Sequence, residues 1–563
     1  MQPFVNQNPA AGGDNANGTE RFNMPFIWGI SLVAAMGGLL FGYDFVVIGG
    51  AKPFFEKFFL ITSENLSGWA NSCALVGCLI GAVVSGGLSD RYGRKRLLLL
   101  AGFLFTTSSL GTGMANDLTT FVVWRIIGGV AIGLASNLSP MYIAEVAPAG
   151  IRGRLVAINQ LTIVIGALLS QVVNWQVAET VPPRPTTSAA IVAKADSLKK
   201  IARGLEAGDA DPKAREMLAV DIKDFETRSK DLQRRYPKLD LSDKKMVNEL
   251  KRSPDSKEAV KQADKLAQKA EWWEIYASWN GEMGWRWMFG LTAAPSLFFF
   301  LLMFFVPESP RWLAKNGKPE KAQQILGRIG GAAYAKRAID DIEATLVNEI
   351  EQVHFRDLLE PKMRKVLVLG VVLALFQQWC GLNVLINYAQ DVFTSAGYGV
   401  SQIMGLIVAL GVANLIFTLV GIFTIDRFGR RILMLAGAAG LTIIYFLIGA
   451  CFYYNSLGIH LFALLVSVMA CFSFSLGPTV WVIISEIYPN RIRGAAVSVS
   501  VFALWFGCFT LIYSFPPLSR FLNMAGTFWL YSAICLGGLL FVWRKLPETK
   551  GKSLEEIERE LVD

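Results

Sequence analysis

The feature that most constrains this chain is a series of apolar runs, each about 20 residues long and separated by polar loops. A helix of that length crosses a hydrocarbon core of about 30 Å. Since the core offers no water to backbone groups, only helices and closed barrels can span it. The composition agrees, because 53% of residues are hydrophobic against about 45–50% in soluble domains. The sequence therefore predicts an all-α membrane protein.

Twelve runs can be counted. They lie near residues 25–51, 67–89, 97–116, 119–142, 155–177, 285–306, 365–394, 402–425, 431–454, 459–485, 494–519 and 525–544. The first is not a cleavable signal peptide, because it is too long and lacks a small-residue cleavage site. Residues 1–24, rich in Asn, Gly and Ala, are expected to be a disordered tail, and residues 545–563 form a second tail.

Lysine and arginine are confined to alternate loops. Basic strings occupy 90–96, 152–154, 426–431, 491–494 and 544–552, whereas "MAND", "TSAGYGVS" and "YNSLGIH" contain neither residue. The positive-inside rule places the basic loops and both termini in the cytoplasm. The net charge of +9 is then a topology signal spread over membrane loops, and we expect no nucleic-acid partner. The chain is expected in a plasma membrane, in particular a bacterial inner membrane.

Three strings occur twice in the same order. "DRYGRK" (90–95) returns as "DRFGRR" (426–431), "EVAPAGIRG" (145–153) as "EIYPNRIRG" (486–494), and "PESPRW" (307–312) as "PETKGK" (547–552). The chain therefore reads as two halves of six runs each. Internal repeats of this kind mark secondary transporters, in which one half rocks against the other.

The repeated strings bring acids and bases to the cytoplasmic ends of helices. We expect ion pairs there to act as a gate between the halves. Exposed pairs contribute only about 0–1 kcal/mol each, so several are needed. Plain topology signalling would explain the bases but not the acids. The candidate gate residues are Asp90, Arg94, Glu145, Arg152, Asp426, Arg430, Glu486 and Arg493.

Residues 178–284 break the repeat. Gly153 precedes Pro307 by 154 positions, whereas Gly494 precedes Pro547 by only 53. The extra segment has charged helical patterns, with helix starts expected at Asp211-Pro212 and Ser253-Pro254 because Pro suits the first turn. By topology it is an extracytoplasmic helical insertion, either a plain cap, a substrate-capturing lid or a dock for an unknown partner. A second helical segment, 318–352, is expected on the cytoplasmic side.

Ten motifs in order resemble the sugar porters of the major facilitator superfamily, which include bacterial xylose/proton symporters and facilitative glucose transporters. Among them are "GYD" (42–44), "GGLSDRYGRK" (86–95), "RIIGGVAIGLAS" (125–136), "GWRWMFG" (284–290), "PESPRWL" (307–313) and "FQQWCGLN" (376–383). The resemblance implies two six-helix bundles around a central cavity. They would comprise 25–177 with 285–306, and 365–544, joined by a cytoplasmic linker with short helices at 307–364.

The resemblance also implies sugar-binding residues. They are Phe41, Gln160, Gln377, Gln378, Asn383, Asn387, Asn414, Trp481 and Trp505. The chemistry fits, because amides both donate and accept hydrogen bonds and aromatic rings cover apolar sugar faces. Amides also join helices without any ligand. Ala167, Asn387 and Leu504 depart from the family pattern, which leaves a hexose, a pentose, a polyol or a cyclic polyhydroxy acid open.

Asp44 and Arg125 lie inside the first and fourth runs. At 1.5 Å per residue both are roughly 10 Å below the outer surface, so they can pair. Either charge alone would be costly in hydrocarbon. Protonated Asp44 would release Arg125 and deprotonated Asp44 would re-engage it. Asp44 is the only well-placed deep carboxylate in this interpretation, and it resembles the acid of proton-coupled porters. The alternative is a static buried ion pair.

The leading hypothesis is a monomeric importer of a monosaccharide by proton symport through alternating access. The alternatives are a facilitative uniporter and a sugar sensor that does not transport. The sequence lacks a P-loop, an H-E-x-x-H string and a G-x-S-x-G string flanked by His, so an enzyme is not expected. We expect neither a cofactor nor a metal.

Overall fold

The structure is a computed structural model that describes residues 22–207, 211–251, 253–347, 360–488 and 493–548. The predicted tails 1–24 and 545–563 therefore lie largely outside the described residues. Within the described ranges every regular element is a helix, and one isolated bridge joins Thr187 and Asp240. The all-helical fold confirms the predicted class.

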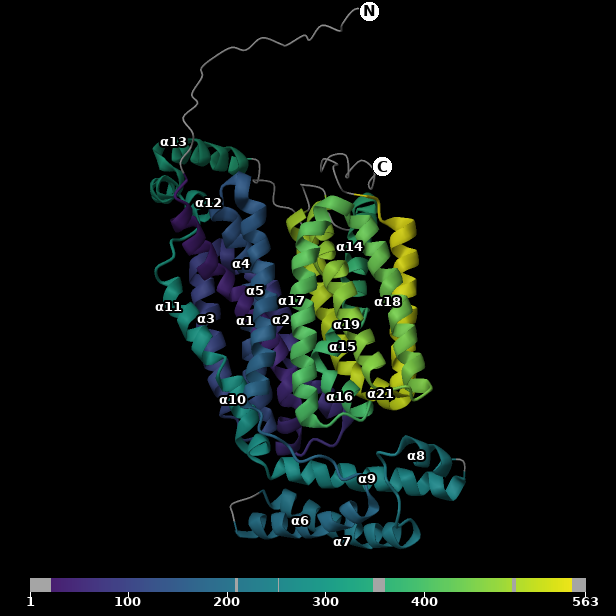
Figure 1. Ribbon diagram of the computed structural model, residues 1–563. Coiled ribbons are helices and arrows are strands. Elements are labelled where there is room, and N and C mark those ends of the chain that lie inside the picture. The colour runs from purple at the N-terminus through teal and green to yellow at the C-terminus, as the bar shows by residue number, and fades with distance from the viewer. Residues whose placement is uncertain (1–21, 208–210, 252, 348–359, 489–492, 549–563) are drawn as a thin grey trace, which may run out of the picture.

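Two bundles stand side by side (Figure 1). The first contains α1 (Met24–Phe58), α2 (Glu64–Tyr92), α3 (Arg94–Gly113), α4 (Leu118–Val146), the short 3-10 turn Ala149–Ile151, α5 (Arg152–Val177), a π-helix (Asn280–Gly284), α10 (Trp285–Gly290) and α11 (Ala293–Met303). The second contains α14 (Pro361–Trp379), α15 (Leu382–Asn387), α16 (Ala389–Ser395), α17 (Val400–Phe428), α18 (Arg430–Tyr453), α19 (Ile459–Phe474), α20 (Leu476–Glu486) and α21 (Arg493–Lys545).

The remaining helices cover opposite ends of the bundles (Figure 1). At one end, here called the insertion end, lie α6 (Ser188–Ala207), α7 (Pro212–Arg235), α8 (Lys244–Leu250) and α9 (Pro254–Tyr276). At the other, here called the terminal end, lie α12 (Pro310–Lys315) and α13 (Pro319–Val347). Helix α13 breaks at Gly331, whose φ is 84°.

Ten segments are long and apolar enough to cross a membrane. Helix α21, with 53 residues, holds two of the predicted runs, and its non-helical residue Asn523 (φ 56°) falls between them. Helix α3 coincides with the third predicted run but is not among these ten segments. It begins with three basic residues. The chain is thus a multi-pass helical membrane protein, and the count of twelve spans stays a prediction.

Three predicted runs have different boundaries or continuity. Helix α1 extends to Phe58 and not to about residue 51, and Lys52, the first residue beyond the predicted run, is neutralised inside the fold by Glu56 and Asp391. The run 365–394 is divided into α14, α15 and α16, and the run 459–485 into α19 and α20 at Ser475. The first of these breaks contains Gly381 at φ 92°, a conformation that glycine adopts without steric cost.

The first bundle is held together by glycines at helix crossings. A Cβ on Gly129 of α4 would lie 1.8 Å from the Ala74 carbonyl oxygen, and one on Gly77 of α2 would lie 2.0 Å from the Ile126 carbonyl oxygen. Small residues let helices in membranes approach to backbone contact. The motif "RIIGGVAIGLAS" therefore sets the α2–α4 packing.

The insertion is a helical unit with its own apolar core, which includes Leu198, Phe225 and Trp273. Helices α7 and α9 begin at Pro212 and Pro254, with Asp211 and Ser253 at the N-cap positions. Both predicted helix starts are confirmed.

Two contacts fix the insertion to the bundles. Glu179 and Asn280 exchange hydrogen bonds, with the Glu179 N–H and the Asn280 Nδ2 each donating at 2.8 Å. This exchange joins the two connections of the insertion to the first bundle. The Val181 N–H donates to Ser401 Oγ at 3.0 Å, and Ser401 belongs to α17 of the second bundle. The insertion therefore contacts both bundles.

The structure explains one pair of repeated strings. Glu308 Oε1 accepts from the backbone N–H of Arg94 (3.0 Å) and of Lys95 (3.1 Å) at the start of α3. Glu548 accepts from the N–H of Arg430 (3.0 Å) and of Arg431 (3.1 Å) at the start of α18. The first N–H groups of a helix have no partner inside it. The acids of "PES" and "PET" thus cap the helix that follows each "DRxGR" turn.

Candidate functional site

Two broken helices of the second bundle face each other. The break between α14 and α15 at Cys380-Gly381 lies beside the break between α19 and α20 at Ser475. Gln377 Nε2 donates to the backbone carbonyl oxygens of Leu476 (3.2 Å) and Gly477 (3.1 Å), at the start of α20. Irregular backbone at membrane depth is tolerated where it lines a cavity or is satisfied by protein. The nitrogen of Gln377 therefore has a structural task.

Four predicted sugar residues form a row of amides along α14 and α15. Gln378 Nε2 donates to Gln377 Oε1 at 3.4 Å, and Asn383 Nδ2 donates to Gln378 Oε1 at 2.5 Å. Asn387 Nδ2 donates to the Asn383 carbonyl oxygen at 2.9 Å. Gln377, Gln378 and Asn387 are buried and Asn383 is half-buried. The row presents donors and acceptors of the kind that hydroxyl groups require.

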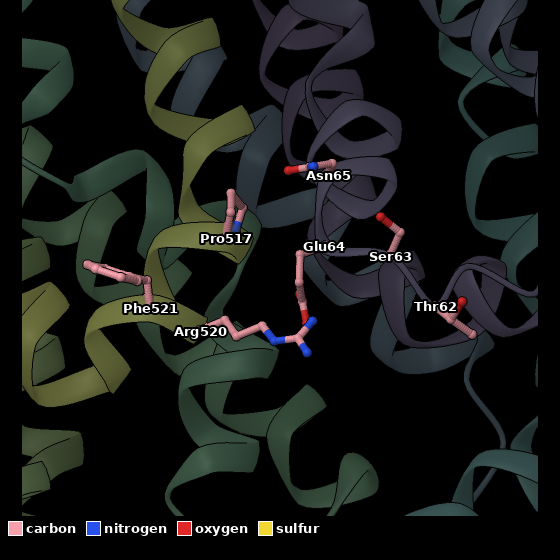
Figure 2. A pocket seen from close by; sticks show the side chains of 7 residues that line it. All are labelled: Thr62, Ser63, Glu64, Asn65, Pro517, Arg520 and Phe521. Atoms are coloured by element: carbon pink, nitrogen blue, oxygen red, sulfur yellow. The ribbon is translucent and has the colours of Figure 1, made fainter.

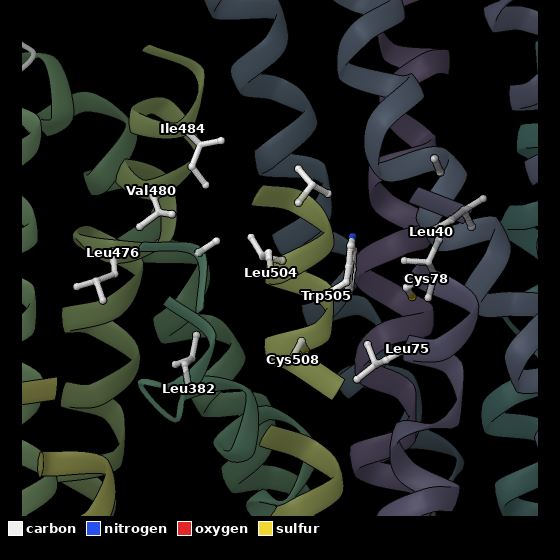
Figure 3. Close-up of a cluster of buried hydrophobic side chains, with 14 of the residues drawn as sticks. Leu40, Leu75, Cys78, Leu382, Leu476, Val480, Ile484, Leu504, Trp505 and Cys508 are labelled. Atoms are coloured by element: carbon white, nitrogen blue, oxygen red, sulfur yellow. The ribbon is translucent and has the colours of Figure 1, made fainter. Parts of the chain in front are cut away.

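An aromatic pair connects the two bundles. The rings of Phe41 on α1 and Trp505 on α21 have centroids 5.6 Å apart. Figure 3 shows Trp505 between the bundles, with Leu504 and Cys508 on the same helix. Trp505 Nε1 is buried and has no hydrogen-bond partner among the described residues. A buried indole N–H usually finds a partner, so this donor is suited to a ligand.

The other predicted sugar residues lie apart from the row. Asn414 Oδ1 on α17 accepts from Ser473 Oγ at 2.6 Å, which joins α17 to α19. Gln160 on α5 is half-buried, and Trp481 on α20 is 37% exposed. In the described part of the chain neither Gln160 nor Trp481 hydrogen-bonds to the amide row. Of the departures from the family pattern, Ala167 and Leu504 are both buried.

Asp44 and Arg125 form the predicted pair. Arg125 Nη1 donates to Asp44 Oδ1 at 2.8 Å, and Nη2 lies 3.3 Å from the Asp44 carbonyl oxygen. Both residues are 3% exposed. The guanidinium also lies 5.1 Å from the ring centroid of Phe289. Asp44 Oδ2 and Arg125 Nε are buried with no hydrogen-bond partner among the described residues. The pair is thus closed to solvent and only partly satisfied.

A small cavity connects this pair to the amide row. It has a volume of about 10 Å³ and is lined by Arg125, Asn71 and Asn387 together with apolar side chains. That volume is close to the least that holds one water molecule. Arg125 and Asn71 belong to the first bundle and Asn387 to the second, so the cavity lies at the interface.

A larger cavity, of about 740 Å³, lies elsewhere (Figure 2). It opens between the start of α2 and the bend of α21, where Arg520 and Glu64 form an ion pair at 3.7 Å. It lies outside the row of amides, and none of the predicted sugar residues lines it.

The predicted gate residues of the first half come together at the terminal end. Arg94 pairs with Asp90 at 3.1 Å and with Glu145 at 3.0 Å. These three residues lie on α2, α3 and α4, so their pairs join helices of the first bundle. The gate between the two halves that the sequence predicts stays a prediction. Arg152 is exposed, and Arg430 donates its backbone N–H to Glu548. The side chains of Asp426, Glu486 and Arg493 lie outside the described residues.

Sequence reasoning missed a charged cluster at the insertion end. Lys52 on α1 lies between Glu56 on the same helix (3.2 Å) and Asp391 on α16 (2.8 Å). Asp391 is inside the predicted run 365–394, so Asp44 is not the only carboxylate of interest. The available signal was a charge at the edge or inside of an apolar run, which is a functional hypothesis by default.

Comparison with known proteins gives the family. The sugar (and other) transporter family matches residues 30–193 and 272–561. The chain belongs to this sugar transporter family. The unmatched residues 194–271 fall within the insertion, which is consistent with an addition to the family's core.

Three similar proteins illustrate the relationship. The chain is 33% identical to the D-xylose-proton symporter of Escherichia coli K12, over 96% of each chain. It is also 33% identical to the arabinose-proton symporter of Bacillus subtilis 168, again over 96% of each. A solved structure of the xylose transporter of Escherichia coli, partially occluded and inward open, matches with a TM-score of 0.69 and 31% identity over 94% of this chain and 100% of that one.

Proposed function

We propose that this sugar transporter imports a monosaccharide by proton symport through alternating access. The observation that carries the proposal is the buried Asp44–Arg125 pair, which lies next to a cavity shared with the amide row. Two relatives named as pentose–proton symporters support it. The bundles 25–177 with 285–306 and 365–544 act as the two moving bodies.

The orientation follows from the basic loops. The terminal end faces the cytoplasm and the insertion faces the outside, in a bacterial inner membrane. The polar contacts Lys52–Asp391 and Val181–Ser401, which join the second bundle to the rest of the chain, are then on the outer side. This arrangement is consistent with a conformation open to the inside. The protein acts as a monomer.

The proton acts on the pair as follows. While Asp44 is charged it holds Arg125, because either buried charge without its partner would be strongly destabilising. When Asp44 takes a proton from outside, Arg125 loses its partner and turns toward the shared cavity, where Asn387 lies. Sugar bound to the amide row and to the free N–H of Trp505 would favour closure around the protonated state. Substrate and proton thus cross together.

The test is uptake by proteoliposomes with a panel of pentoses, hexoses and polyols, with and without a pH gradient. Asp44→Asn should remove accumulation above the external concentration and keep exchange, because a neutral residue cannot cycle a proton. Asp117→Asn is the matched control. Asp117 is an exposed N-cap of α4, and Asn caps equally well, so accumulation should be unchanged. If Asp44→Asn still accumulates sugar, the proton is coupled by another route than Asp44. If the parent chain does not accumulate sugar under a pH gradient, it is a uniporter, and either outcome overturns the proposal.

A further inference from the structure

Lys52 is a buried cation that the proton mechanism does not use. It is 5% exposed, and its Nζ contacts Asp391 Oδ1 at 2.8 Å and Glu56 Oε2 at 3.2 Å. It also lies 5.4 Å from the ring centroid of Tyr388. Charges inside apolar helices are expensive and mark functional positions. A lysine shared by two acids therefore calls for an explanation.

The cluster crosses the boundary between the bundles. Lys52 and Glu56 lie on α1 of the first bundle, and Asp391 lies on α16 of the second. The backbones are close here, since a Cβ on Gly49 would lie 2.5 Å from the Ile386 carbonyl oxygen. The Lys52–Asp391 contact thus depends on closure of the bundles at the insertion end.

The two acids have different relations to the lysine. Glu56 is one turn from Lys52 on the same helix and is also held by Ser67 Oγ (2.5 Å) and Asn71 Nδ2 (3.1 Å), both from α2. The Lys52–Glu56 pair therefore survives separation of the bundles. Asp391 would lose Lys52 and meet water instead. Separation leaves a neutral pair on one bundle and a hydrated acid on the other, which avoids the large cost of an unpaired buried charge.

We propose that Lys52 and Asp391 form the outer gate of the transporter, an ion pair that exists only while the insertion end is closed. Glu56, on the same helix as Lys52, remains its ion-pair partner and neutralises it when the gate opens. The gate adjoins the proton pair, because Asn71 contacts Glu56 and also lines the cavity beside Arg125. The inference rests on alternating access from the proposed function.

The experiment measures the distance between the bundles at the insertion end. Spin labels are placed on the full chain in lipid nanodiscs at Met114→Cys, in the first bundle, and Ser456→Cys, in the second. Both positions are exposed. The native cysteines are free, so the parent chain without added cysteines gives the background. Pulsed electron paramagnetic resonance then gives the populations of short and long distances at neutral pH without sugar.

Asp391→Asn should raise the ratio of open to closed insertion ends by about tenfold, equivalent to about 1.4 kcal/mol. Lys52→Met should raise it as well. Glu56→Gln should leave the gate closed, because it keeps the Lys52–Asp391 pair and an acceptor for Ser67 and Asn71. Exchanging the charges in the double variant Lys52→Asp, Asp391→Lys should restore closure in part, since the cation moved to the second bundle would face two acids of the first.

The matched control is Lys269→Met. Lys269 pairs with Asp221 at the same 2.8 Å, but both residues lie inside the insertion, so the distances should not change. The gate is rejected if Asp391→Asn and Lys52→Met leave the distances unchanged, or if Glu56→Gln opens the end as much as Asp391→Asn. The readout needs no sugar transport, so loss of accumulation in Asp44→Asn and opening in Asp391→Asn can each fail separately.

Discussion

The first bundle carries a base held between two acids at each end, and the two arrangements have different consequences. At the terminal end Arg94 pairs with Asp90 and Glu145, all on helices of one bundle. At the insertion end Lys52 pairs with Glu56 on its own helix and with Asp391 on the other bundle. Rocking of the bundles would break only the second network. An ion network can therefore act as a gate only if its charges lie on both bundles. A network confined to one bundle stabilises that bundle.

The largest predicted effect tests the scaffold. Arg94→Met should lower stability by about 3–5 kcal/mol, because it removes the cation that the largely buried Glu145 contacts at 3.0 Å, and movement of the bundles cannot relieve this. Thermal melting of the purified protein should show the loss of stability, while the distance between the spin labels at the insertion end should stay short. The opposite pattern, an unchanged melting temperature with separated labels, would reverse the comparison.

Arg228→Met supplies the control for that substitution. Arg228 pairs with Asp224 on the exposed surface of the insertion, with side chains 57% and 36% exposed. Exposed pairs contribute about 0–1 kcal/mol, so its melting temperature should stay close to that of the parent.

A smaller effect is expected at the helix caps. Glu308→Ala should cost about 0.5–2 kcal/mol, the usual range for loss of a helix N-cap, because Glu308 accepts from two N–H groups at the start of α3. Glu548→Ala should cost a similar amount at the start of α18. Melting curves of both variants test whether the two repeated acids have the same helix-capping role. A clear shift in only one variant would mean that the two halves differ.

The smallest effect is expected at Ser401. Ser401→Ala removes the hydrogen bond from the Val181 N–H, a loss of about 1 kcal/mol. It should open the insertion end less than Asp391→Asn does. Label distances in the two variants give the order directly, and an equal or greater opening in Ser401→Ala would make the insertion, and not the ion pair, the main closure.

The sequence was sufficient to predict the helical class, the helix starts of the insertion and the contact between Asp44 and Arg125. Length, capping residues and depth along a helix are local quantities. The breaks at Cys380-Gly381 and Ser475 were not predicted, because an apolar run reports that a segment crosses the membrane and not whether its helix is continuous. Lys52 and Asp391 lie 339 positions apart, and their contact depends on how the bundles meet.

The double hydrogen bond between Glu179 and Asn280 has a practical consequence. It joins both connections of the insertion next to the start of α10. The helices of the insertion should therefore rotate together with the first bundle. An antibody fragment raised against α6 and α7 would then serve as a fiducial for electron cryomicroscopy. Its angle to the second bundle would report the state of each particle.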